Sequence, residues 1–126
     1  MNKVLVLGGG SWGTTLANLL AEKDHDVSLW ARNSKIFSKE KTNWVNNKYL
    51  PKYNLSKQLK IISNLKNAFK DVDLLIIAIP SKGFRSISSK ISKYLDEQKI
   101  LIASKGIENQ SFMTMSEVFV DETNSV

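Results

Sequence analysis

The chain has no cysteine and only one histidine among its 126 residues. The lack of cysteine excludes a disulfide framework and a thiolate metal site, and a single histidine cannot by itself assemble a zinc or iron centre. We therefore expect no metal. The histidine, His25, lies between two aspartates; we expect it to be exposed and assign it no role.

Long apolar runs are also missing. No stretch approaches the roughly 20 apolar residues of a membrane-spanning helix. The first apolar run, residues 4–7, is too short for the core of a signal peptide. The sequence thus predicts a cytoplasmic protein without membrane insertion.

Acidic residues are in the minority, with 12 Asp and Glu against 18 Lys and Arg and a formal net charge of +6. This balance suits an anionic partner, either nucleic acid or phosphorylated small molecules. The lysines of residues 39–66 are scattered without an aromatic stacking pattern, which favours a solvated surface. Nucleic acid remains a second candidate, and a phosphorylated small molecule is the first.

Apolar runs of strand length alternate with segments of helical period, in a composition typical of one soluble globular domain. This order predicts an α/β fold with a doubly wound, mostly parallel sheet and helices on both faces, of the Rossmann type. The predicted strands are residues 3–7, 27–31, 59–62, 73–79 and 99–103. The predicted helices are residues 12–23, 65–69 and 84–95.

Two other segments have a weaker pattern. Residues 34–45 are polar and weakly periodic, and we predict a helix there, followed by an irregular stretch over residues 46–51 because a residue before proline disfavours helix. We predict a last helix over residues 115–120, after which the helical pattern is lost in the polar residues 121–125. Because no further strand is predicted after this helix, we expect the sheet to be incomplete at the C-terminus.

The string GGGSWG at residues 8–13 matches G-x-G-x-x-G between the first predicted strand and helix. Gly8 permits the tight turn, Gly10 lets a diphosphate approach the backbone, and Gly13 lets the helix pack close to the sheet. The amides that begin at Ser11 would face the phosphates. The alternative is a glycine-rich turn without a ligand.

Apolar residues recur at Trp12, Leu16, Leu19 and Leu20, which places them on one face of the predicted helix. An aromatic at this spacing is often a core residue, which is the alternative to a role for Trp12 at the binding site.

The end of the second predicted strand lacks the carboxylate that usually holds the ribose 2′-hydroxyl of NAD. Arg32 stands there instead, and its planar cation suits the 2′-phosphate of NADP. We therefore predict NADP(H) as the preferred cofactor, with NAD(H) possible. The alternative is a surface arginine.

Five motifs occur in one order along the whole chain: GGGSWGT at residues 8–14, LWAR at 29–32, NNKYLP at 46–51, IPS at 79–81 with FR at 84–85, and SKGIE at 104–108. Through them the chain resembles the N-terminal NAD-binding domain of bacterial NAD(P)-dependent glycerol-3-phosphate dehydrogenase. The resemblance implies hydride transfer between a nicotinamide and dihydroxyacetone phosphate, which gives sn-glycerol 3-phosphate, a phospholipid precursor.

The resemblance also implies roles for particular residues. Ser11, Trp12 and Arg32 would contact the cofactor, with Tyr49 and Pro80 beside it. Lys105 would lie between the nicotinamide and the substrate; a cation at the carboxyl end of a parallel strand could hold a phosphate or polarise a carbonyl, although a solvated turn lysine is the alternative.

Members of this family are about two and a half times longer and carry a helical C-terminal domain with the lysine taken as general acid/base. Residues 1–126 would be only the N-terminal part of the cofactor domain, with the substrate domain absent. We expect such a chain to bind cofactor without catalysing alone. The resemblance allows a homodimer of the full-length form.

Two other functions stay open. One is a non-catalytic NAD(P)-binding or sensing module. The other is a related dehydrogenase acting on sugar acids or hydroxy acids, against which the KGIE string at residues 105–108 argues.

Overall fold

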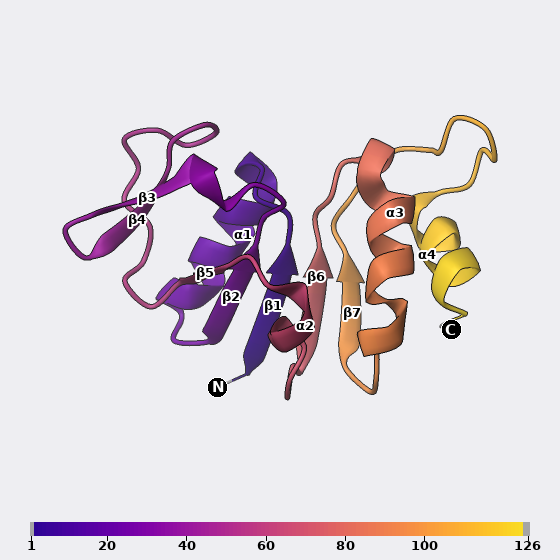
Figure 1. Ribbon diagram of the computed structural model, residues 1–126, viewed down its shortest axis with the longest axis horizontal. Coiled ribbons are helices and arrows are strands. Elements are labelled where there is room, and N and C mark those ends of the chain that lie inside the picture. The colour runs from indigo at the N-terminus through magenta and orange to yellow at the C-terminus, as the bar shows by residue number, and fades with distance from the viewer. Residues whose placement is uncertain (1, 125–126) are drawn as a thin grey trace.

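A computed structural model describes residues 2–124 of the chain (Figure 1). Its centre is a five-stranded parallel sheet in the order β5-β2-β1-β6-β7. The strands are β1 (Lys3–Leu7), β2 (Asp26–Trp30), β5 (Lys60–Ile62), β6 (Leu74–Ile77) and β7 (Lys99–Ile102). The chain order reverses at β1, as in the Rossmann fold. The predicted α/β class is therefore confirmed.

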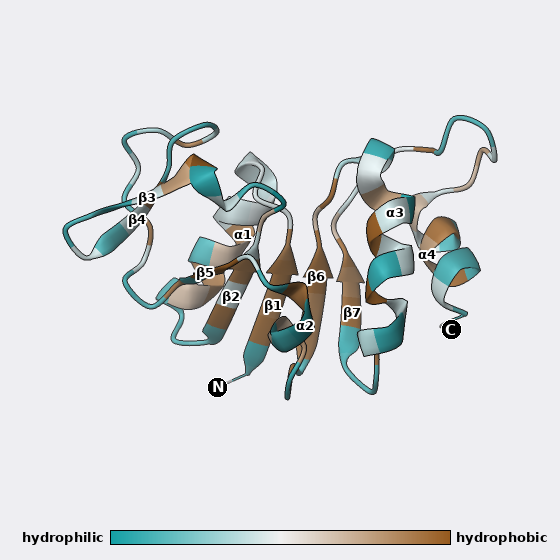
Figure 2. Cartoon of the chain, viewed as in Figure 1, coloured by the Kyte–Doolittle hydropathy of each residue, from teal (hydrophilic) through white to brown (hydrophobic). Residues whose placement is uncertain are grey.

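Helices cover both faces of this sheet, because successive strand residues point to opposite sides. Val4 and Val6 belong to a core that includes residues of α1 (Ser11–Glu22), whereas Leu5 and Leu7 belong to a second core with α3 (Ser81–Ile91) and α4 (Met115–Thr123). Figure 2 shows β1, β2, β6 and β7 as largely hydrophobic. Two cores separated by one sheet are what a doubly wound architecture requires.

The predicted apolar face of α1 packs on the core only in part: Leu16 and Leu20 are partly buried against it. Trp12 and Leu19 are 55% and 48% exposed. The small and polar residues of the helix are buried instead: Gly13, Thr14, Ala17, Asn18 and Ala21. Small side chains bring the helix axis close to the sheet, while Trp12 and Leu19 stay exposed.

The predicted helix over residues 34–45 is also wrong. A short 3₁₀ turn, η1 (Ser34–Ile36), is followed by the antiparallel hairpin of β3 (Phe37–Glu40) and β4 (Asn43–Asn46). Cross-strand pairs account for the hairpin: Lys39 faces Trp44, with its Nζ 5.2 Å from the ring centroid. The aromatic and β-branched residues of this segment favour strands, and they outweigh a weak helical period.

The other helices agree with the predictions apart from their ends. The short α2 (Leu65–Ala68) forms as expected, while α3 stops at Ile91 and a 3₁₀ turn, η2 (Ser92–Tyr94), completes the predicted segment. The predicted last helix, residues 115–120, continues to Thr123 in α4, and Ser125 of the fading tail lies outside the described residues. Of the helices in residues 2–124, none has the length and apolar character that crossing a membrane requires.

Candidate functional site

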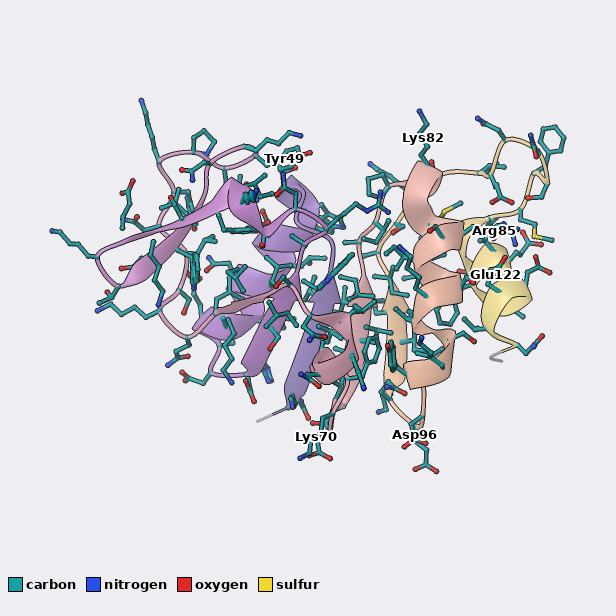
Figure 3. The ribbon with its side chains drawn as sticks, viewed as in Figure 1. Tyr49, Lys70, Lys82, Arg85, Asp96 and Glu122 are labelled. Atoms are coloured by element: carbon teal, nitrogen blue, oxygen red, sulfur yellow. The ribbon has the colours of Figure 1, made fainter. Side chains whose placement is uncertain are left out.

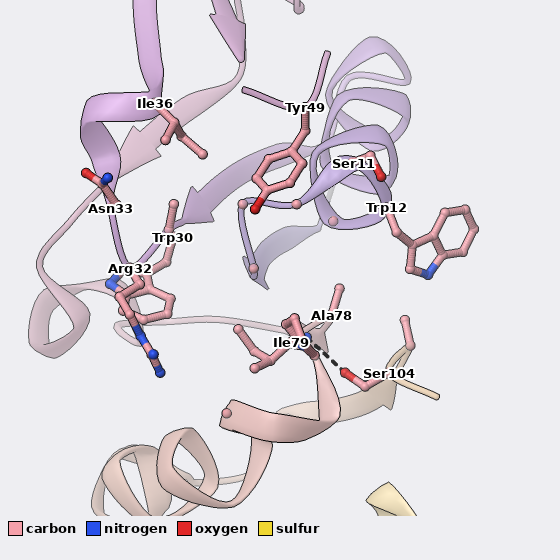
Figure 4. A pocket seen from close by; sticks show the side chains of 18 of the residues that line it. Ser11, Trp12, Trp30, Arg32, Asn33, Ile36, Tyr49, Ala78, Ile79 and Ser104 are labelled. Carbon is pink, nitrogen blue, oxygen red and sulfur yellow. Dashed lines mark hydrogen bonds between the residues drawn. The ribbon is translucent and has the colours of Figure 1, made fainter. Parts of the chain in front are cut away.

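A groove of about 1230 Å³ opens along the carboxyl edge of the sheet (Figure 4). Its volume exceeds the roughly 300–1,000 Å³ of typical ligand pockets. The segments that follow β1, β2, β6 and β7 form its walls, together with the segment after β4. All nine sequence-predicted site residues line it: Gly8, Gly10, Ser11, Trp12, Gly13, Arg32, Tyr49, Pro80 and Lys105.

The three motif glycines differ in what surrounds them. Gly8 has a φ of +126°, and a Cβ there would lie 2.2 Å from the carbonyl oxygen of Ala78. A Cβ on Gly13 would lie 2.1 Å from the carbonyl oxygen of Gly8. Gly10 is different, because a Cβ there would meet nothing within 4 Å. Gly8 and Gly13 therefore serve the turn itself, while Gly10 leaves open space beside the backbone.

The first turn of α1 faces this open space. Gly10 is the N-cap residue, and no side chain caps the helix. The backbone amides of a first turn lack partners within the helix and carry its positive dipole end. Ser11, Trp12 and Gly13 line the groove, so the arrangement is suited to an anion such as a diphosphate.

The charged residues that line the groove are all cations: Arg32, Lys48, Lys82 and Lys105, without a carboxylate among the described lining residues. Arg32 extends from the end of β2 toward α3, and a Cβ on Gly83 would lie 3.3 Å from its Nη2 (Figure 4). Such a lining favours a ligand with several negative charges.

The ends of β6 and β7 are joined beside the groove by one serine. Ser104 Oγ accepts a hydrogen bond from the Ile79 amide at 2.9 Å and donates to the Ile77 carbonyl at 3.2 Å (Figure 4). Ser104 directly precedes Lys105, so these bonds fix the strand end from which the exposed Lys105 extends.

The loop after Lys105 also packs against α3, at Gly106 and at Glu108. A Cβ on Gly106 would lie 3.3 Å from the Cβ of Ser81, the first residue of α3. Glu108, three residues beyond Lys105, accepts hydrogen bonds from Arg85 and Ser111. The bonds from Arg85, and to a smaller extent that from Ser111, lower the pKa of Glu108 to about 2. Lys105 is thus placed at the groove by a loop held at both ends.

Two of the predicted site residues at the groove are aromatic. Tyr49 is 45% exposed, and Lys48 Nζ is 5.2 Å from its ring centroid. Trp12 points outward on the other side of the glycine loop (Figure 4), so its alternative as a core residue is wrong. Cofactor contact by these two residues stays a prediction.

Sequence reasoning missed several lining residues, among them Ile36, Lys48, Lys82 and Ser104. Lys48 stands next to Tyr49 and Lys82 follows the Pro80 strand end, so their positions beside predicted site residues could have indicated them. Ile36 gave no signal, because it lies in the segment predicted as helix. The side chain of His25 lies away from the groove, where its Nδ1 accepts a hydrogen bond from the Asn2 amide at 3.3 Å.

Comparisons with known proteins agree with this arrangement. The glycerol-3-phosphate dehydrogenase (NAD(P)+) of Acinetobacter baylyi is 39% identical over 98% of this chain and 35% of its own length. That of Carboxydothermus hydrogenoformans is 42% identical over 94% of this chain and 36% of its own length. The crystal structure of glycerol-3-phosphate dehydrogenase from Coxiella burnetii superposes with a TM-score of 0.86 at 32% identity, covering 99% of this chain and 38% of that one.

The chain therefore spans little more than a third of the length of these relatives. A family model described as the N-terminus of NAD-dependent glycerol-3-phosphate dehydrogenase matches residues 3–126. The chain belongs to this family of dehydrogenase N-terminal domains.

Proposed function

We propose that this chain is the dinucleotide-binding domain of an NAD(P)-dependent glycerol-3-phosphate dehydrogenase, which reduces dihydroxyacetone phosphate to sn-glycerol 3-phosphate. The observation that carries the proposal is the glycine loop at the first turn of α1, which opens on a groove lined by cations and without carboxylates among its described residues. The relatives' names supply the substrate.

The diphosphate of the cofactor would lie at the glycine loop. Gly10 has no atom within 4 Å of the place where a Cβ would stand, so phosphate oxygens can approach the backbone amides there. The uncapped first turn of α1 adds donors and a favourable dipole. The residues present thus fit a dinucleotide.

NADP(H) is the proposed preference. Arg32 lies at the end of β2, where an NAD-specific site usually has a carboxylate. Its fork of donors suits the 2′-phosphate, and Gly83 leaves room for the guanidinium beside α3. NAD(H) binding remains possible through the shared diphosphate contacts.

Lys105 would act at the substrate end of the groove. When bound, the reduced nicotinamide supplies a hydride. The Lys105 ammonium would hold the substrate phosphate or polarise its carbonyl, from a strand end that Ser104 fixes. The group that protonates the product oxygen would come from the part of the relatives that this chain does not span, so the chain alone should bind cofactor without turnover.

Three further predictions belong to the same proposal: a part in phospholipid precursor synthesis, a cytoplasmic location and a homodimer of the full-length form. A sensing module that binds the dinucleotide without catalysis is the alternative, and no feature of the described groove favours it.

A fluorescence titration tests the proposal. Trp12 and Trp30 line the groove, so bound NADPH should quench tryptophan emission to a saturable limit by energy transfer. ATP, which has an adenine and a phosphate chain but no nicotinamide, should displace NADPH less effectively than NADP⁺. Equal displacement by ATP would indicate a general nucleotide site and contradict the proposal.

A further inference from the structure

The side chain of Asn46, the last residue of β4, is completely buried at 0% exposure. Its Nδ2 donates two hydrogen bonds, one to the Gly9 carbonyl and one to Thr14 Oγ1, each at 2.9 Å. Its Oδ1 accepts a third from the Tyr49 amide at 3.1 Å. A buried amide with both donors and its acceptor engaged fixes the groups around it, because each lost bond would leave a polar atom unsatisfied.

The bond to Gly9 acts on the glycine loop itself. The Gly9 carbonyl and the Gly10 amide belong to one planar trans peptide, so fixing the oxygen also fixes the direction of the N–H on the other side. This loop has three glycines in a row, which are conformationally free residues. Asn46 therefore sets the orientation of a peptide that lines the groove.

The other two hydrogen bonds of Asn46 fix two further groups, Thr14 and the Tyr49 amide. Thr14, also 0% exposed, belongs to the first turns of α1, and the bond to its hydroxyl holds the start of that helix. The bond to the Tyr49 amide holds the segment that brings Tyr49 to the groove wall (Figure 4). One side chain from the hairpin thus joins the Tyr49 segment to the glycine loop and the start of α1, which lie more than thirty residues earlier in the sequence.

We infer that Asn46 is a positioning residue for dinucleotide binding: through its buried amide, the β3–β4 hairpin orients the diphosphate-binding peptide at Gly9 and Gly10 and the Tyr49 wall. Asn46 acts through these groups and does not itself line the groove. The inference rests on the proposed function and adds a determinant to the same site.

Asn43 supplies a matched control. It lies on the same strand, and its Nδ2 donates to the Leu55 carbonyl at 2.7 Å, outside the glycine loop. Asn46→Ala and Asn43→Ala thus each remove an amide that bonds a main-chain carbonyl. The dissociation constants of NADPH and NADH are measured below the unfolding midpoint of each variant, and the midpoints are recorded separately.

We expect Asn46→Ala to weaken the binding of both dinucleotides by a similar factor of about ten or more, because both dinucleotides carry the diphosphate. Asn43→Ala should leave both within about twofold of the wild type. A merely structural role would lower the unfolding midpoint and leave the dissociation constants of the folded protein unchanged. Asn46→Asp, which keeps the acceptor for Tyr49 and loses the donors to Gly9 and Thr14, should bind as weakly as Asn46→Ala.

Folded Asn46→Ala with both dissociation constants within about twofold of the wild type would overturn the inference. If Asn46→Ala does not fold, Asn46→Ser, which keeps a smaller hydrogen-bonding group, is judged by the same two outcomes. A wild-type chain that binds neither dinucleotide would instead remove the proposed function, and the inference with it.

Discussion

Arg85 on α3 binds both carboxylate oxygens of Glu108, with Nε to Oε2 and Nη2 to Oε1 distances of 2.8 Å each. Its Nη1 also bonds Asp121 and Glu122 on α4, at 2.7 and 2.8 Å (Figure 3). One guanidinium therefore connects α3, the loop after Lys105 and α4. The pairing between two motif residues, Arg85 and Glu108, explains why the loop that carries Lys105 has a defined place beside the groove.

This pairing predicts a pH dependence of stability. Hydrogen bonds from Arg85 lower the pKa of Glu108 to about 2, from an ordinary value of 4.5. Because the folded value is the lower one, ionised Glu108 stabilises the fold fully above pH 4.5, and this contribution is lost as the pH falls toward 2. Glu108→Gln should thus unfold at a lower temperature than the wild type at neutral pH.

Thermal unfolding of both proteins, followed by circular dichroism across this pH range, measures the difference. The gap between the two midpoints should close as the solution becomes acidic. A gap that stays constant from neutral pH to pH 2 would contradict the assignment of the shift to Glu108.

The glycine loop predicts opposite results for two substitutions to alanine. In Gly13→Ala the new methyl group collides with the Gly8 carbonyl, so we expect a loss of stability of about 1–3 kcal/mol. In Gly10→Ala the methyl group meets no protein atom and should leave stability nearly unchanged. It fills the space proposed for the diphosphate, however, and NADPH affinity should fall by about tenfold or more.

Thermal unfolding and NADPH titration of the two variants separate these effects. A Gly10→Ala protein with wild-type affinity would show that the ligand does not approach this backbone. An unchanged midpoint for Gly13→Ala would contradict the close packing of α1 on β1.

The proposed preference for NADP(H) rests on the side chain of Arg32. Removing the charge–phosphate contact in Arg32→Ala should reduce the ratio of NADPH to NADH affinity by about 10- to 100-fold. Lys35, an exposed cation nearby that does not line the groove, provides the control, and Lys35→Ala should keep the wild-type ratio. Competitive titrations measure the NADPH-to-NADH affinity ratio of each protein. Equal ratios in wild type and Arg32→Ala would show that the 2′-phosphate does not bind at Arg32.

The sequence alone is enough to predict most of the parallel sheet and nine of the residues that line the groove. Strands β1, β6 and β7 are mainly aliphatic runs, and in a parallel sheet every segment after a strand emerges at the same edge. For this reason the residue pattern places Gly8, Arg32, Pro80 and Lys105 together, although they are distant in sequence.

Other features depend on tertiary contacts that leave no local pattern. The hairpin in place of the helix predicted over residues 34–45 forms through pairs such as Lys39 with Trp44. The buried face of α1 is chosen by how closely Gly13 approaches Gly8. Asn46 is visible in the sequence only as one letter of a motif, because its role comes from a glycine loop more than thirty residues away.

The proposed function requires a dinucleotide diphosphate to bind at the first turn of α1. Isothermal titration calorimetry of the folded wild-type chain with NADPH and with NADH measures this binding. We predict saturable binding to one site, tighter for NADPH, and strongly weakened in Gly10→Ala. If the folded chain shows no binding heat with either dinucleotide at millimolar concentration, and neither perturbs its tryptophan emission, the claim is contradicted.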